Sequence, residues 1–198
     1  MTQRSQMSRR TLRFIQHYPT PKQIYDSIID GEMWPYKTNK DFYVTRDKAL
    51  VALTYLIAGR ISEVLRITTK QFVVEKARVT VQSIALSKSY KRDKPRNDLY
   101  RQEAWLPLEG KRAQLTQLVL DYLEICETDR LFPFGRIRAF QIISTITGEP
   151  CHWLRAYGEN YLYDEWDKDI LAVANYVKVD VQTLQRYVRR AYAKYKPT

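Results

Sequence analysis

The hydrophobic pattern changes twice along this 198-residue chain, and the change limits the folds that are open to it. Apolar residues recur at helical spacing up to about residue 70, alternate with polar residues between residues 71 and 108, and then return to helical spacing. Strands confined to one stretch of a helical chain are typical of an α+β protein rather than of a parallel α/β sheet. We therefore expect a mainly α fold with a small three-stranded antiparallel sheet.

Capping residues, prolines and glycines bound the expected elements. Thr20, Pro21 and Gly31 are the residue types of an N-cap, a first helical position and a stop, so they predict a helix over residues 20–31. The most apolar helix, residues 45–58, is expected to be buried and to end at Gly59. Further helices are expected over residues 61–67, 111–126, 137–146, 152–163, 168–176 and 181–195. Strands are expected over residues 72–74, 78–86 and 103–108, with a long basic hairpin loop over residues 87–101.

Two further groups of residues have expected structural roles. The acidic side chains between residues 164 and 169 are expected to cap the first turn of the following helix, and they are Asp164, Glu165, Asp167 and Asp169. Five apolar residues have little alternative to a place in the core, and they are Leu50, Leu53, Leu56, Val173 and Leu184.

The net charge favours a polyanionic partner. The chain holds 33 Lys and Arg against 22 Asp and Glu, a formal charge of +11. Basic residues cluster over residues 4–13, 88–112 and 178–196, and aromatic residues are interleaved with the last two clusters. That pattern favours nucleic acid over a merely solvated basic surface. The residues expected to bind the nucleic acid are Lys91, Arg92, Lys94, Arg96, Arg186 and Arg190.

Several classes of protein are excluded by composition. Cys126 and Cys151 are too few for a disulfide framework and lack the spacing of a zinc site. The longest apolar run, residues 49–58, is far shorter than the about 20 residues of a membrane span. Only six glycines are present, without a phosphate-binding loop, and the carboxylates form no persuasive metal set. We expect a soluble intracellular protein without a metal or other cofactor.

Four short stretches stand in an informative order: GRISE at residues 59–63, SKS at residues 87–89, HWLR at residues 152–155, and Tyr187. In this order they resemble the catalytic domain of the tyrosine recombinase (phage integrase) family. That family carries an arginine in a GxRxSE-like box, a lysine on a β-hairpin, an HxxR box, a histidine or tryptophan, and a tyrosine nucleophile. Arg60 and Lys88 are 28 residues apart, and Arg155 and Tyr187 are 32 apart, both of the size that the family uses. The resemblance extends from about residue 20 to residue 198.

The chain departs from the family pattern at two positions. No residue separates Gly59 from Arg60, where the family has one. Lys178 stands nine residues before Tyr187, where the family commonly has histidine or tryptophan. A lysine at that position can still bind a non-bridging phosphate oxygen.

The resemblance implies that a tyrosine attacks a DNA phosphodiester and forms a 3′-phosphotyrosine without metal or ATP. The planar guanidinium groups of Arg60 and Arg155 then stabilise the charge on the non-bridging oxygens. Tyr187 is the implied nucleophile, because among Tyr176, Tyr187, Tyr192 and Tyr195 it has the family spacing.

The resemblance also assigns supporting roles. Lys88 is the candidate general acid for the departing 5′-hydroxyl, in competition with Lys91 and Lys94. His152 is a candidate base or hydrogen-bond partner of the nucleophile or the phosphate. Glu63 lies one turn beyond Arg60 and is expected to orient it.

The implied domain organisation is a basic N-terminal arm, residues 1–19, followed by a catalytic domain, residues 20–198. Too few residues precede Arg60 for the N-terminal clamp domain of the family, so we expect either a fragment or a minimal enzyme. The expected partners are double-stranded DNA and further copies of the chain in a tetrameric synapse, in the cytoplasm of a host cell and associated with its nucleoid.

The expected function is that of a site-specific integrase from a virus or other mobile element, with an archaeal source suggested by the divergent boxes. Two alternatives remain open. One is a type IB-like topoisomerase, which shares the chemistry but religates the same strand. The other is a non-catalytic DNA-binding protein that retains the fold. Lys178 and the altered first box favour this alternative, because both depart from the family's catalytic pattern.

Overall fold

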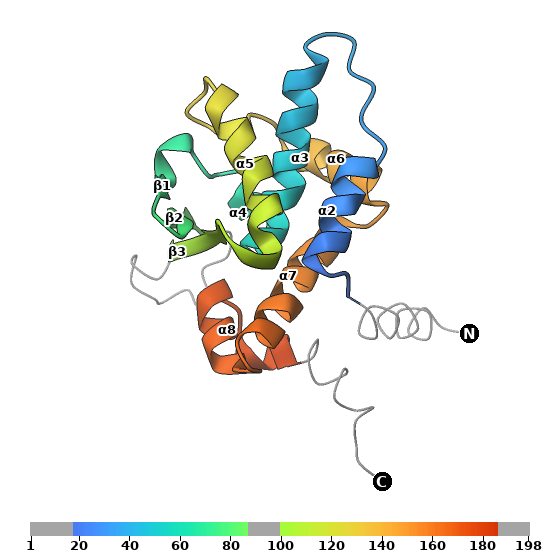
Figure 1. The fold of residues 1–198 in the computed structure, drawn as a ribbon. Helices are drawn as coiled ribbons and strands as arrows, with labels where there is room; N and C mark the ends of the chain where they lie inside the picture. The colour runs from blue at the N-terminus through green and yellow to red at the C-terminus, as the bar shows by residue number, and fades with distance from the viewer. Residues whose placement is uncertain (1–17, 87–99, 186–198) are drawn as a thin grey trace, which may run out of the picture.

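A computed structural model describes residues 18–86 and 100–185 (Figure 1). Its helices and strands follow the order that the hydrophobic pattern predicts. The helices are α2 (Pro21–Asp30), α3 (Lys40–Leu56), α4 (Ile61–Val64), α5 (Ala113–Ile125), α6 (Arg136–Thr147), α7 (Cys151–Glu165) and α8 (Ile170–Val177). The strands are β1 (Phe72–Val74), β2 (Arg78–Ala85) and β3 (Tyr100–Pro107), and the short 3-10 turns are η1 (Thr69–Gln71) and η3 (Gly110–Arg112).

Helix α3 lies at the centre of the fold. It contacts α2, α5, α6 and α7 around its circumference, and its apolar second half is buried throughout (Figure 1). The helix begins five residues before its predicted start at residue 45. Asn39 turns the chain in a left-handed conformation with φ of 47°, and Phe42 in the first turn packs its ring 5.8 Å from that of Tyr122. Tertiary contacts of the first turn therefore extend the helix beyond its apolar run.

The end of α3 also differs in detail from the expectation. The helix ends at Leu56, and Ala58 rather than Gly59 takes the left-handed conformation, with φ of 47°. At Gly59 the constraint is space, because a Cβ atom there would lie 2.9 Å from the side chain of Ile57. The chain then enters α4 at once, so the end of α3 fixes where Arg60 stands.

The three strands form one antiparallel sheet in the order β1-β2-β3. Val79 pairs with Leu106 and Val81 with Ala104, and all four side chains are buried on the face toward the core. Strand β3 begins at Tyr100, which corrects the prediction that residues 100 and 101 belong to the loop. The pairing of Ala85 with Tyr100 lengthens the strand, and cross-strand pairing is not visible in a single strand's pattern.

An aromatic cluster joins α8 to the free edge of β3. The backbone N–H of Trp105 donates a hydrogen bond of 2.8 Å to the hydroxyl of Tyr176 on α8. The rings of Trp105, Trp166 and Tyr176 pack with centroids 5.0–6.5 Å apart. This contact gives Tyr176 a structural partner and brings the C-terminal helices against the sheet.

Helix α7 approaches α3 closely at Gly158. A Cβ atom at this glycine would lie 2.3 Å from the carbonyl oxygen of Tyr55 and 3.1 Å from the Cβ of Ala58. Only a glycine allows this contact. The backbone of α7 therefore lies directly on the C-terminal end of α3, one turn from Arg155.

A second, smaller core joins α7, α8 and the last described turn, residues 181–185, which is helical. Its fully buried members are Ala58, Leu162, Val173, Ala174, Val177 and Leu184. The predicted core residues are all confirmed, since Leu50, Leu53, Leu56, Val173 and Leu184 have no exposed surface.

The acidic stretch before α8 has a divided role. Asp169 caps α8 as predicted and accepts hydrogen bonds from the backbone N–H groups of Leu171 and Ala172. Asp164 and Glu165 instead belong to the last turn of α7, where Asp164 pairs with Lys168 and Glu165 pairs with Arg112. The prediction of a joint cap is therefore wrong for these two residues, because the C-terminal end of α7 extends two residues beyond its predicted end and includes them.

Candidate functional site

Arg60 stands between the end of α3 and the start of α4, and one carboxylate binds it twice. Its backbone N–H donates to Glu63 Oε2 at 2.9 Å, and its Nη1 donates to Glu63 Oε1 at 2.8 Å. The side chain of Arg60 is 25% exposed and that of Glu63 is 5% exposed. Glu63 thus holds both the backbone and one terminal nitrogen of an arginine whose side chain is partly exposed.

Arg155 is held in the same way on α7. Its Nε donates to Glu159 Oε1 at 2.7 Å, one helical turn further along. The side chains of Arg155 and Glu159 are 13% and 4% exposed. Within the described part of the chain, the two terminal nitrogens of Arg155 have no hydrogen-bond partner. They remain available for an anion.

The two pairs lie close enough for each to act on the other. Burial raises the pKa of Glu63, but hydrogen bonds and charge from Arg60, together with the charge of Arg155, lower it overall. Burial raises the pKa of Glu159, and the charges of Arg155 and Arg60 oppose this shift while Glu63 adds to it. The sequence separates Arg60 from Arg155 by 95 residues, yet the fold brings them into one electrostatic cluster.

His152 lies three residues before Arg155 on α7, so the two side chains share one face of the helix. The imidazole is exposed at the start of the helix, and its ring centroid lies 5.8 Å from that of Trp153. Desolvation lowers the pKa of His152, and the charge of Glu149 opposes that shift. A lowered pKa favours the neutral imidazole, which can accept a proton at neutral pH.

Lys178 stands at the C-terminal end of α8 in a left-handed conformation with φ of 52°. Its Nζ donates to Asn175 Oδ1 at 3.0 Å. No contact joins it to Arg60 or Arg155 within residues 18–86 and 100–185. The structure thus brings Arg60, Glu63 and Arg155 together but does not bring Lys178 to them.

The remaining candidate residues lie outside the described residues. They are the basic arm from residue 1 to 17, the hairpin residues Lys88, Lys91, Arg92, Lys94 and Arg96, and the C-terminal residues Arg186, Tyr187, Arg190, Tyr192 and Tyr195. Leu184, two residues before the first of the C-terminal group, is fully buried in the cluster that also contains Ala58.

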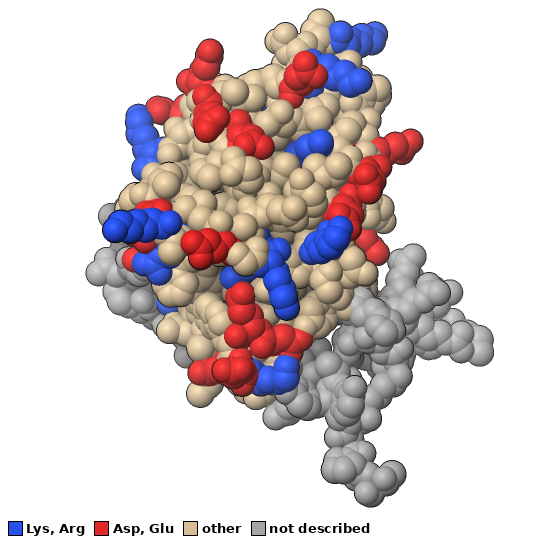
Figure 2. All heavy atoms as spheres, viewed as in Figure 1, with Lys and Arg blue, Asp and Glu red and all other residues tan. Residues whose placement is uncertain are grey.

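The positive charge of the chain is concentrated in the segments outside the described residues. Residues 18–86 and 100–185 hold 19 Lys and Arg against 20 Asp and Glu, whereas the other 43 residues hold 14 against 2. The face in Figure 2 accordingly carries basic and acidic side chains side by side. Arg112, which the sequence grouped with the basic hairpin, is buried and bound to Glu165.

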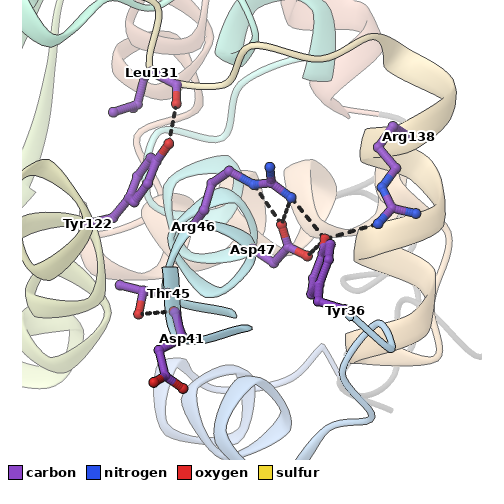
Figure 3. Close-up of polar contacts among 8 residues, drawn as sticks. All are labelled: Tyr36, Asp41, Thr45, Arg46, Asp47, Tyr122, Leu131 and Arg138. Carbon is purple, nitrogen blue, oxygen red and sulfur yellow. Dashed lines mark hydrogen bonds and ion pairs between the residues drawn. The ribbon is translucent and has the colours of Figure 1, made fainter. Parts of the chain in front are cut away.

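A second buried ionic cluster, which sequence reasoning missed, joins the loop before α3 to α3 and α6 (Figure 3). The Tyr36 hydroxyl donates to Asp47 at 2.5 Å and accepts from Arg46 at 2.8 Å and from Arg138 at 3.0 Å. The guanidinium of Arg46 lies 4.7 Å from the ring centroid of Phe134. Rings and partners thus enclose this arginine, which indicates a structural role.

The described residues contain no group of three His, Cys, Asp or Glu side chains arranged to hold a metal ion. Both cysteines are free thiols. None of the described helices is long and apolar enough to cross a membrane.

The comparisons with known proteins identify the fold through structure alone. No protein-family model matches the chain, and no curated protein matches its sequence. Among solved structures, the XerH site-specific recombinase in its post-cleavage complex with a palindromic difH substrate aligns with a TM-score of 0.62 at 18% identity, over 90% of this chain and 52% of that one. The pre-cleavage complex of XerH with difH aligns with a TM-score of 0.63 at 17% identity, over 92% and 56%.

This chain therefore spans about half the length of the recombinase that it resembles. The alignments extend over nine-tenths of this chain. The chain has the catalytic-domain fold of the tyrosine recombinases.

Proposed function

We propose that this chain is a site-specific DNA recombinase that cleaves and rejoins DNA through a 3′-phosphotyrosine. The observation that carries the proposal is the convergence of Arg60 and Arg155, from α4 and α7, in a fold shared with XerH. The same two arginines belong to the boxes at residues 59–63 and 152–155 that resemble the family.

In the proposed reaction the arginine pair binds the scissile phosphate. Attack on a phosphodiester places additional negative charge on the non-bridging oxygens. A planar guanidinium offers two parallel N–H groups to such oxygens, and two guanidinium groups from different elements hold the phosphate from two directions. Stabilising charge that develops only in the transition state lowers the barrier directly.

The other proposed participants are the nucleophile and the groups that transfer protons. Tyr187 attacks the phosphorus and stores the bond energy in the phosphotyrosine, so no ATP is needed for rejoining. Lys88 donates a proton to the departing 5′-hydroxyl, and neutral His152 accepts a hydrogen bond from the nucleophile or donates one to the phosphate. Lys178, whose Nζ contacts Asn175 in this structure, has to release that contact to bind a non-bridging oxygen.

The packing around Ala58 and Leu184 supports the proposed place of Tyr187. Ala58 stands two residues before Arg60, and Leu184 stands three residues before Tyr187. Both are buried in the same small core. The chain that precedes the nucleophile is therefore anchored beside the chain that precedes the first arginine.

Double-stranded DNA is the proposed partner. The two XerH structures contain a difH substrate, and the segments outside the described residues hold 14 basic residues against 2 acidic ones. Such segments bind a phosphate backbone with strong salt dependence. The proposal also includes two further points. The chain assembles into a tetrameric synapse on DNA, and it acts as the integrase of a mobile element.

The test is covalent trapping on a pool of nicked duplexes of randomised sequence. Cleavage beside a nick releases a short 5′-hydroxyl fragment, so rejoining fails and the phosphotyrosine accumulates as an adduct that survives a denaturing gel. We expect an adduct from the full chain and from Tyr192→Phe, and none from Tyr187→Phe. An adduct that persists in Tyr187→Phe overturns the assignment of the nucleophile.

Two other outcomes identify the alternative functions. Relaxation of a supercoiled plasmid without exchange between two recovered sites identifies a topoisomerase. Bound DNA without an adduct under any condition identifies a binding module that retains the fold. Lys178, with its Nζ bound to Asn175 where the family has histidine or tryptophan, is the observation that favours this last reading.

A further inference from the structure

Glu159 is the most deeply buried carboxylate of the arginine cluster, and neither motif of the family accounts for it. Its side chain is 4% exposed, and its one described hydrogen bond joins it to Arg155 Nε. A buried carboxylate is costly unless it is paired and hydrogen-bonded. An acid at this position therefore requires the arginine as its partner.

The pair differs from the other buried arginine pairs in what covers the guanidinium. Arg46 lies against the rings of Tyr43 and Phe134 at 4.7 Å, and Arg112 lies 5.2 Å from the ring of Tyr161. Among the described residues, no aromatic ring covers Arg155. Arg155 is thus held at Nε by an acid without a described ring over its guanidinium, whereas a ring lies beside each of the two structural arginines.

The point of attachment sets which part of the guanidinium is free. Nε is the inner nitrogen of the guanidinium, so its bond to Glu159 fixes the plane of the group and leaves both terminal nitrogens free. A fixed plane matters because two parallel N–H groups bind phosphate oxygens only in one orientation.

We propose that Glu159 is a positioning residue that orients Arg155 toward the scissile phosphate. This inference rests on the proposed function and adds to it a residue outside the family's motifs. Glu159 acts through Arg155 and does not touch the DNA. Its negative charge, with that of Glu63, also allows two arginines to stand side by side before a phosphate arrives.

The experiment measures adduct formation and DNA affinity separately in the full chain, on a nicked duplex recovered from the trapping pool. Glu159→Gln keeps an acceptor oxygen but loses the charge, and we expect cleavage at saturating protein to slow by about tenfold. Glu159→Ala removes the acceptor, and we expect a loss on the order of a hundredfold. DNA affinity is expected not to fall in either variant, because a negative charge near the phosphate is removed.

Glu165→Gln is the matched control. Glu165 accepts from Arg112 Nη2 at 2.7 Å, so this variant also removes the charge of a glutamate that pairs with a buried arginine, but here the guanidinium lies beside a ring. We expect it to lower thermal stability and to leave cleavage per folded molecule unchanged. Folding is followed for every variant by thermal unfolding, so that only folded protein enters the comparison.

A pH profile separates positioning from mere structural support. The charged groups that act on Glu159 are Arg155 on its own helix and Arg60 and Glu63 at α4. Because burial raises the pKa of Glu159, wild-type cleavage is expected to fall as acidification protonates the carboxylate and weakens its hold. Glu159→Gln has no titratable group at this position. Its cleavage rate is therefore expected to lack the fall that protonation of Glu159 causes, and to keep the part of the pH dependence that His152 causes.

The outcomes distinguish the inference from the function on which it rests. If the wild type forms no adduct, the proposed function fails and the inference falls with it. If the wild type forms an adduct and both Glu159 variants cleave at the wild-type rate, only the inference is overturned. A fall in DNA affinity equal to the fall in cleavage also overturns it, because Glu159 would then support binding rather than orientation.

Discussion

Glu63 and Glu159 are both buried beside an arginine, yet their pKa values shift in opposite directions. Burial raises the pKa of each. Glu63 receives two hydrogen bonds from Arg60, one from the backbone and one from the side chain, and these outweigh burial. Glu159 receives one from Arg155, and burial prevails. The second hydrogen bond to Glu63 and the like charge of Glu63 beside Glu159 account for the opposite directions of the two pKa shifts.

The lowered pKa of Glu63 makes the stability of the fold depend on pH. A carboxyl group whose folded pKa lies below its unfolded value stabilises the fold above the unfolded pKa, and that stability is lost as the pH falls through the folded pKa. Glu63→Gln is expected to cost on the order of 1–3 kcal/mol at neutral pH, the range for a hydrogen bond to a charged group. Acidification should then narrow the difference in free energy of unfolding between Glu63→Gln and the wild type, because the wild type loses the contribution of the ionised carboxylate.

Thermal unfolding of Glu63→Gln and the wild type between pH 3 and pH 7 measures this difference. The range includes pH values on both sides of the pKa of an unperturbed glutamic acid, about 4.3. Glu124→Gln, at an exposed position on α5, is the control and should follow the wild type at every pH. Parallel curves for wild type and Glu63→Gln would mean that the contact between Glu63 and Arg60 contributes nothing to stability.

Among the helices, α7 is positioned by a close backbone approach as well as by its buried side chains. Gly158 allows its backbone to lie on the carbonyl of Tyr55, and Gly31 allows the end of α2 to approach the carbonyl of Ile146, where a Cβ atom would lie 2.2 Å away. Gly31 has φ of −66°, so it is required there for space and not for a left-handed turn. Both contacts fix helices against the core that carries the site.

Gly158→Ala is expected to destabilise the fold by about 1–3 kcal/mol, because the added methyl group has no space. The variant should also slow cleavage, since α7 must move away from α3 and carries Arg155 with it. Gly135→Ala is the control, because a Cβ atom there meets nothing within 4 Å. Urea unfolding and the adduct assay measure the two effects. A Gly158→Ala variant of wild-type stability would mean that α7 is free to shift.

The sequence predicted the elements and their order, and it failed where a contact between elements sets a boundary. The start of α3 depends on the packing of Phe42, and the start of β3 on the pairing of Tyr100 with Ala85. Glu159 was missed although a signal was present, because an acid four residues after Arg155 on a helix is a pairing position. The cluster around Arg46 has no comparable signal, since its partners come from separate elements.

At the scale of the whole molecule, the chain divides into a charge-balanced body and strongly basic segments. The net charge of +11 suggested a basic surface, but residues 18–86 and 100–185 have one more acid than base. Within that body Arg60 and Arg155 each pair with a buried glutamate, and the two pairs influence each other. Composition indicates a polyanionic partner, but only the fold indicates where a single phosphate would be held.

Adduct formation by Arg60→Lys, Arg155→Lys and the double variant tests most directly whether the two arginines serve one phosphate. Lysine keeps the charge but cannot replace a planar group that binds two oxygens. We expect each single variant to lose about 10²–10³ in cleavage rate, the range for one lost donor to developing charge. The double variant should lose less than the product of the two, because residues that act as a unit are not additive. A folded single variant that cleaves at the wild-type rate, or losses that multiply, would contradict the account.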